Sequence, residues 1–416
     1  MSFQTALSGL SASSRSLDVI GNNIANSSTP GMKSSRAEFS DLVTASLGAG
    51  GGAGVGIGVT ASVSQQFSQG GISVTGNTLD VAVNGSGFFQ ATMPDGTTAY
   101  TRAGNFKLDT TGNLVTNSGG KVLGFPTDKN GTRTSGTLQA MKLPTGAPIP
   151  ASATTKITAE LNLNAGAPLA AADPTAVPPR LATPRSVYGT SLTAFDSQGS
   201  TVPVSMYFVK TATDTWEVYD AIDNPTATPP VVGALVTTLN FDVNGKLAPL
   251  AANPTINLTS TNSNIGAAGV FTAELDLSSI TQFGTSFAVS NLTQDGYTAG
   301  ELTKVNIGIT GAITAAYSNG QTQTAGQLVL ANFLNVQGLV PVGGNNWVES
   351  QASGQPVLGV PGEGKYGALQ SGALEDSNVD LTAELVNMMT AQRAYQSNAQ
   401  AIKTQDQILS TLVNLR

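Results

Sequence analysis

The chain has 416 residues, of which only 11% are charged, and 26 acidic against 19 basic residues give it a net charge of −7. This acidic balance argues against nucleic acid as a partner. The absence of both Cys and His excludes disulfides, thiol nucleophiles, imidazole bases and the usual zinc ligands.

The N-terminal segment is not expected to act as a membrane anchor or a cleaved secretion signal. No run approaches the roughly 20 apolar residues of a transmembrane helix. Residues 1–24 lack the basic start and the continuous apolar block of a cleaved signal peptide. We therefore expect no membrane insertion and, if the protein is exported, a route that retains its N-terminus.

The first predicted element is a helix from about residue 2 to about residue 26. The run SSTPG at residues 27–31 ends it, because Pro disfavours helix at the residue before it and Gly permits a turn. Apolar residues recur at alternating steps of four and three, the spacing of a coiled-coil stripe. The predicted seam residues are Phe3, Leu7, Leu10, Leu17 and Ile24, with Ser14 and Gly21 at the intervening seam positions and the apolar Ile20 beside them.

The middle of the chain predicts strands. The Gly-rich residues 48–58 indicate a flexible connector. Residues 71–145 predict short hairpins, in which the large apolar residues Leu79, Val81 and Val83 stand at every second position. Prolines after residue 143 and an Ala/Pro-rich stretch at 165–184 indicate that the chain passes into a different domain here. From residue 296 the alternating pattern of the first β segment returns.

The last predicted element is a helix from near Ser377 to the end of the chain, opened by a capping box between Ser377 and Asp380. Its seam has the same four-three spacing. The predicted seam residues are Leu381, Leu385, Met388, Tyr395, Ile402, Leu409 and Val413. Gln392, Ala399 and Asp406 interrupt this stripe, and apolar residues flank it, which suits a helix with several neighbours.

Together these elements predict a mainly β protein with α-helical termini. The terminal helices pair in a coiled-coil-like manner, and a central β domain is split by an inserted second β domain. We expect a terminal helical domain of residues 1–30 plus 375–416 and a connector of 31–70 plus 355–374. The first β domain is expected at 71–145 plus 291–354, and the inserted domain at 146–290.

The residue inventory indicates no enzyme. Glu375 and Asp376 could form a catalytic pair, but just ahead of a helix they are expected to be cap and dipole residues. Arg102 is expected on the surface of a hairpin. Ser is abundant, yet no His is present to activate it. We expect no catalytic residue, no metal and no cofactor.

Several motifs resemble those of the bacterial flagellar rod and hook protein family, and most closely its hook proteins. The matching runs are DVIGNNIAN at 18–26, TPGMK at 29–33, LDVAV at 79–83, GFF at 87–89, YTRAGNF at 100–106, LANF at 330–333, GALE at 372–375, NVDL at 378–381, ELV at 384–386 and QRAYQSN at 392–398. Met32 stands where the family usually has an aromatic residue. The resemblance is weakest in 146–290.

This resemblance implies an extracellular subunit that polymerises with itself into a curved, flexible tube between rod and filament. It implies contacts with rod proteins, the hook cap and hook–filament junction proteins, and export by the flagellar type III apparatus. The terminal helices would line the inner tube. Phe39 and Val43 fit a loose export-gate pattern of a Phe with an apolar residue four positions later.

The sequence also allows other roles for the terminal helices and for the whole chain. Each terminal stripe could simply pack on its own β domain, or form a helical core within one chain. A distal rod protein shares both termini and the first β domain but typically lacks so large an insert. A surface adhesin-like β protein would suit the Thr- and Asn-rich strands but would need a signal peptide or an anchor.

Overall fold

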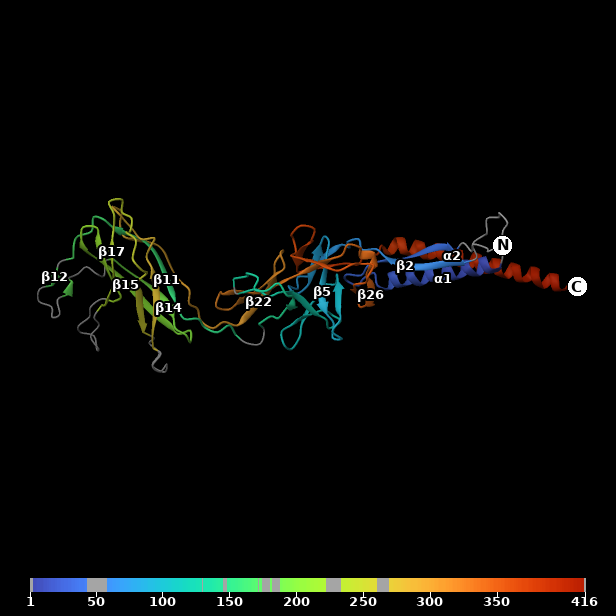
Figure 1. Cartoon of the computed structure of the whole chain (residues 1–416), viewed down its shortest axis with the longest axis horizontal. Coiled ribbons are helices and arrows are strands. Elements are labelled where there is room, and N and C mark those ends of the chain that lie inside the picture. Colours follow the sequence, from blue (N-terminus) through green and yellow to red (C-terminus); the bar gives the residue numbers. More distant parts are fainter. Residues whose placement is uncertain are drawn as a thin grey trace. The chain divides into compact units, whose positions relative to one another are not determined.

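A computed structural model describes residues 3–42, 58–128, 130–144, 148–170, 172–173, 180–181, 188–221, 233–259 and 269–414. The chain is mainly β, with one helix near each terminus (Figure 1). This confirms the predicted fold class. Two compact units are present: Met1–Gly146 with Thr303–Ala316 and Thr322–Arg416, and Ala147–Leu302 with Tyr317–Gln321.

The terminal helices are α1 (Phe3–Ala25) and α2 (Leu381–Asn414), and they pack against each other in the first unit. Beside them lies a hairpin of β1 (Ser35–Leu42) and β2 (Gly58–Gln65), paired from Ser35↔Gln65 to Leu42↔Gly58. In Figure 1 this hairpin runs alongside α1. An isolated two-stranded hairpin is marginally stable, so its packing on α1 supports it.

The β body of the first unit is built on one large sheet, whose strands differ in length. Its strand order is β22 (Leu302–Ile307), β23 (Ala312–Tyr317), β24 (Thr322–Leu328), β9 (Lys121–Phe125), β5 (Phe88–Thr92), β6 (Thr98–Thr101), β27 (Asn346–Val348) and β26 (Val340–Gly343). Beside this path lie β7 (Lys107–Leu108), β8 (Leu114–Val115), β10 (Gln139–Ala140), β25 (Leu330–Asn332) and β28 (Val357–Gly359). A short 3₁₀ helix, η2 (Val336–Gly338), precedes the edge strand β26.

Two small ladders connect this body to the helices. Strand β4 (Val81–Asn84) pairs with β29 (Ala368–Ser371), and β3 (Ile72–Val74) pairs with β30 (Ala373–Glu375). Because β30 ends six residues before α2 begins, the β body fixes where the C-terminal helix starts.

Aromatic side chains form a core in this body. Phe88, Tyr100, Phe333 and Trp347 are buried together, and Phe67 packs against them. Their rings meet edge to face, with the Tyr100 and Phe333 centroids 4.8 Å apart. Edge-to-face pairs contribute about 0.5–1.5 kcal/mol beyond the buried area.

The second unit contains two sheets over a shared core. One contains β18 (Thr255–Thr259), β19 (Val270–Asp276), β11 (Lys156–Asn164), β20 (Thr281–Phe283) and β21 (Ala288–Gln294). The other contains β14 (Gly189–Phe195), β15 (Thr201–Ala212), β16 (Thr215–Tyr219) and β17 (Leu235–Asn240), and a separate ladder joins β12 (Ala172–Asp173) to β13 (Arg180–Leu181). Alternate residues of β11 and β15 point into the core, as expected for half-buried strands.

The second unit extends further along the chain than the predicted insert of residues 146–290. Strand β21 pairs with β11, so the second unit continues past residue 290, where the insert was expected to end. Because β21 pairs with β11, a central strand of its sheet, β21 belongs to the second unit. The finer four-part division of the chain stays a prediction.

Candidate assembly surface on the terminal helices

The start of α2 differs from the sequence prediction. The helix begins at Leu381, and Asp380 caps it by accepting hydrogen bonds from the backbone N–H of Thr382 at 2.9 Å and Ala383 at 3.1 Å. The predicted start near Ser377 is wrong because Asn378 bonds to the base of the β1–β2 hairpin instead. Its side chain accepts from the N–H of Ser34 at 2.7 Å and donates to the Gln66 carbonyl at 2.7 Å.

The contact between α1 and α2 includes small and polar residues. Gly9 lets Asn398 approach so closely that a Cβ at this glycine would lie 3.0 Å from the Asn398 amide nitrogen. That amide also donates to the Ser13 hydroxyl at 3.4 Å. Nearer the β body, Asn23 donates to Glu384 at 3.1 Å. The apolar seam is therefore only part of what holds the two helices together.

The predicted seam residues divide into two groups. Ile20 is buried, and Leu10, Leu17, Ile24, Met388 and Ile402 are half-buried. Leu7, Leu381, Leu385 and Tyr395 are exposed, Leu385 by 46%. Phe3, Leu409 and Val413 lie in the helices, but their side chains are outside the described part of the structure. The role of these residues in assembly stays a prediction.

The exposed group extends beyond the predicted stripe. Leu381, Leu385 and Met389 follow one another at four-residue steps, which places them in one row on the helix surface. Val386 beside this row is also exposed. The row appears because α1 covers a neighbouring side of α2, where Glu384 contacts it. The four-three pattern predicted an apolar face but not which side of it α1 covers.

The proposed export motif is only partly described. Phe39 lies in β1, is exposed, and pairs through its backbone with Ala61 of β2. Val43 lies outside the described residues. The motif stays a prediction.

A buried ionic cluster, which the sequence did not reveal, joins the helices to the β body. The Nζ atom of Lys33 lies 2.6 Å from Oε1 of Glu375, and Nη1 of Arg102 lies 3.4 Å from Oε2. The side chains of Lys33 and Glu375 have no exposed surface, and Arg102 has 6%. Burial lowers the pKa of Lys33, and its hydrogen bond to Glu375 opposes this shift.

Two sequence expectations are corrected here. Glu375 lies in β30 and serves as the common carboxylate of this cluster, so it does not cap α2. Arg102 is buried rather than on a hairpin surface, and its guanidinium lies 5.0 Å from the centre of the Phe88 ring. A charged residue is not expected to be buried unless it is paired, and the partner here is 273 residues away.

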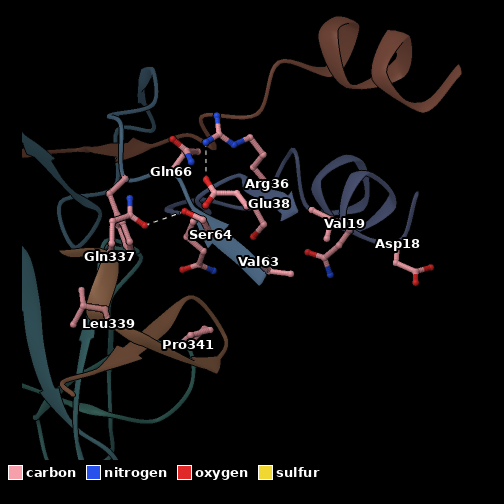
Figure 2. Close-up of a pocket in the computed structure, with 14 residues that line it drawn as sticks. Asp18, Val19, Arg36, Glu38, Val63, Ser64, Gln66, Gln337, Leu339 and Pro341 are labelled. Carbon is pink, nitrogen blue, oxygen red and sulfur yellow. Dashed lines mark hydrogen bonds and ion pairs between the residues drawn. The ribbon is translucent and has the colours of Figure 1, made fainter. Parts of the chain in front are cut away.

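A groove of about 820 Å³ lies between α1, the β1–β2 hairpin and the segment leading into β26 (Figure 2). Its lining comprises Asp18, Val19, Asn22, Ser35, Arg36, Glu38, Val63, Ser64, Gln65, Gln66, Phe67, Gln337, Leu339 and Pro341. Arg36 and Glu38 form an ion pair at 2.6 Å, and the Ser64 hydroxyl donates to Gln337 at 3.2 Å.

The described residues contain neither a cluster of metal-binding side chains nor a helix that could span a membrane. Among them, no group of three or more acidic side chains is placed to hold a metal ion. Neither α1 nor α2 combines the length and hydrophobicity that a membrane-spanning helix requires.

Protein-family models of flagellar domains match four segments of the chain. Residues 3–33 match "Flagella basal body rod protein", and 82–160 match "Flagellar hook protein FlgE/F/G D1 domain". Residues 162–297 match "Flagellar basal body protein FlaE D2 domain", and 370–415 match "Flagellar basal body rod FlgEFG protein C-terminal".

Full-length relatives agree with these matches. The chain is 43% identical to the flagellar hook protein FlgE of Escherichia coli and 44% identical to that of Salmonella typhimurium, and each alignment covers 100% of both chains. The flagellar hook protein FlgE2 of Helicobacter pylori has a similar fold, with a TM-score of 0.54 over 73% of this chain and 100% of that one, at 17% identity. The chain therefore belongs to the bacterial flagellar hook protein family.

Proposed function

We propose that this chain is the structural subunit of the flagellar hook. In this role it assembles with copies of itself into a curved, flexible tube that transmits torque from rod to filament as a universal joint. The full-length similarity to hook proteins supports the proposal. The observation that carries it is the exposed apolar row Leu381, Leu385 and Met389 on a helix that is already paired with α1.

This row supplies a physical reason for assembly. Apolar surface removed from water contributes roughly 25 cal/mol per Å². A helix with apolar residues on the side that its intramolecular partner leaves open gains this free energy only from another molecule. The low charge content helps, because surfaces rich in uncharged polar residues meet without strong like-charge repulsion.

The proposal includes partners and a location. At its ends the polymer would contact rod proteins, the hook cap and hook–filament junction proteins. The subunit would reach the cell exterior through the flagellar type III apparatus without a cleaved signal peptide, with Phe39 and Val43 as its export-gate motif. Family membership supports these assignments.

The rival roles have less support. A distal rod protein would share the terminal matches, but full-length hook relatives and a match to the D2 domain at 162–297 favour the hook. An adhesin-like protein would not share the matches to flagellar domains at both termini.

Electron microscopy of basal bodies from a strain that lacks this gene tests the proposal. Complete rods without hooks, restored to hooks by the wild-type gene, are expected. Truncated rods would instead make the chain a rod protein. Intact hooks with filaments would contradict the proposed function altogether.

A further inference from the structure

The groove described above is lined by five apolar residues among its polar ones, and it holds one unpaired acid. Figure 2 shows Leu339 and Pro341 near β26, Val63 on β2, and Val19 with Asp18 on α1. Val63 lines the groove and is 61% exposed. Three charged side chains line the groove, and Arg36 and Glu38 neutralise each other. Asp18 is exposed and forms no ion pair with any described residue, so the lining carries one uncompensated negative charge.

The exposed row of α2 has the complementary pattern. The next position of the row after Leu381, Leu385 and Met389 is Arg393, four residues further on. Arg393 is exposed and, within the described chain, forms no ion pair. From Leu381 to Arg393 the row is about 18 Å long at 1.5 Å per residue. It thus presents three apolar anchors followed by one unpaired positive charge.

We infer that the groove between α1, the β1–β2 hairpin and β26 receives helix α2 of a second copy of this chain. The inference rests on the proposed self-assembly and names the surface where it occurs. The apolar anchors Leu381, Leu385 and Met389 enter against Val19, Val63 and Pro341. Arg393 of the entering helix pairs with Asp18. This is the helix-in-groove mode, in which residues at helical spacing serve as anchors.

The chain's own α2 does not make this contact. Its Glu384 accepts a hydrogen bond from Asn23 of α1, and the row is exposed within the single chain. The charge match favours a second copy over an unrelated partner, because the groove lacks one positive charge and the row supplies it.

Cysteine cross-linking tests the contact directly, because the chain contains no Cys of its own. A strain would co-express a tagged Val63→Cys chain and an untagged Leu385→Cys chain, and isolated hooks would be oxidised mildly and resolved on a gel. We expect disulfide-linked heterodimers of one tagged and one untagged chain. The matched control replaces Val63→Cys with Val243→Cys, a 98% exposed turn residue of the second unit, and should give at least about fivefold fewer heterodimers.

A charge exchange provides the second measurement. Asp18→Arg and Arg393→Asp should each lower the hook yield, by about fivefold for loss of an exposed ion pair, and the double variant should restore it. Hooks that contain both cysteine chains without heterodimers above the control, or a double variant no better than either single one, would overturn this groove and leave the proposed function intact. Absence of the wild-type chain from isolated hooks would refute the proposed function itself.

Discussion

At the scale of single residues, the carboxylate of Glu375 holds the buried cluster with Lys33 and Arg102 together. Both of its oxygens are used, and Oε1 also accepts from the N–H of Gly70 at 3.0 Å. The backbone carbonyl of Glu375 accepts from the N–H of Gly31 at 2.7 Å. The segment after α1 and the segment before α2 are therefore joined at one residue.

Substitution of Glu375 should strongly destabilise the first unit. Glu375→Ala leaves two buried cations without their anion, and breaking a buried pair in this way costs about 3–5 kcal/mol. The free energy of unfolding would be measured by guanidinium denaturation with Trp347 fluorescence in a Trp216→Phe background. Glu38→Ala removes an exposed ion pair with Arg36 and, as the control, should cost at most about 1 kcal/mol. Equal effects of the two variants would contradict the importance of burial.

Asp276 gives the second unit a defined acid sensitivity. Hydrogen bonds from Ser278 and the ion pair with Lys156 at 2.9 Å lower the pKa of Asp276 to about 2. Because this pKa is depressed in the folded state, the stabilisation is present above the unfolded pKa near 4 and is lost as pH falls towards 2. We expect Asp276→Asn to lower Tm at pH 6 and to differ much less from the wild type at pH 2. A constant difference in Tm at both pH values would exclude this carboxylate as the cause.

At the scale of elements, the four-three periodicity predicted both helices but not how they share their faces. The row Leu381, Leu385 and Met389 is exposed because Gly9 and Asn398 bring α1 against another side of α2. Helix pairing of this kind depends on where small residues allow a close approach, and a single apolar stripe does not encode that.

The exposed row predicts the behaviour of Leu385→Asp. A charge at its centre should abolish assembly through the cost of burying an unpaired carboxylate at a subunit contact. The β units should remain folded, because Leu385 is exposed within the chain. Electron microscopy would score hooks, and thermal melting of the purified chain would report folding, with Val243→Asp in the second unit as a control that assembles normally. Unfolding of the β units in Leu385→Asp would refute this assignment.

At the scale of the whole molecule, the second unit has its own core of two sheets and is connected to the first by few segments of chain. A unit with a hydrophobic core of its own can in principle fold independently. We propose that it tunes the bending of the hook and is not required for its assembly.

Deletion of residues 147–302 tests this assignment. Tubes should still form, because the helices and the groove belong to the first unit. Their curvature in electron micrographs should differ from that of wild-type hooks. Thermal melting of the first unit serves as the folding control, and a folded deletion variant that forms no tube would contradict the proposal.

The mainly β class, the two terminal helices and the absence of Cys and His chemistry could all be predicted from the amino-acid sequence, because they follow from local periodicity and composition. The motifs near both ends also sufficed to indicate the family. Three features depend on tertiary contacts: which apolar residues of α2 stay exposed, the bonding of Asn378 to the base of the β1–β2 hairpin, which delays the helix start, and the meeting of Lys33, Arg102 and Glu375 in the interior. These features join segments hundreds of residues apart, and no local pattern records such contacts.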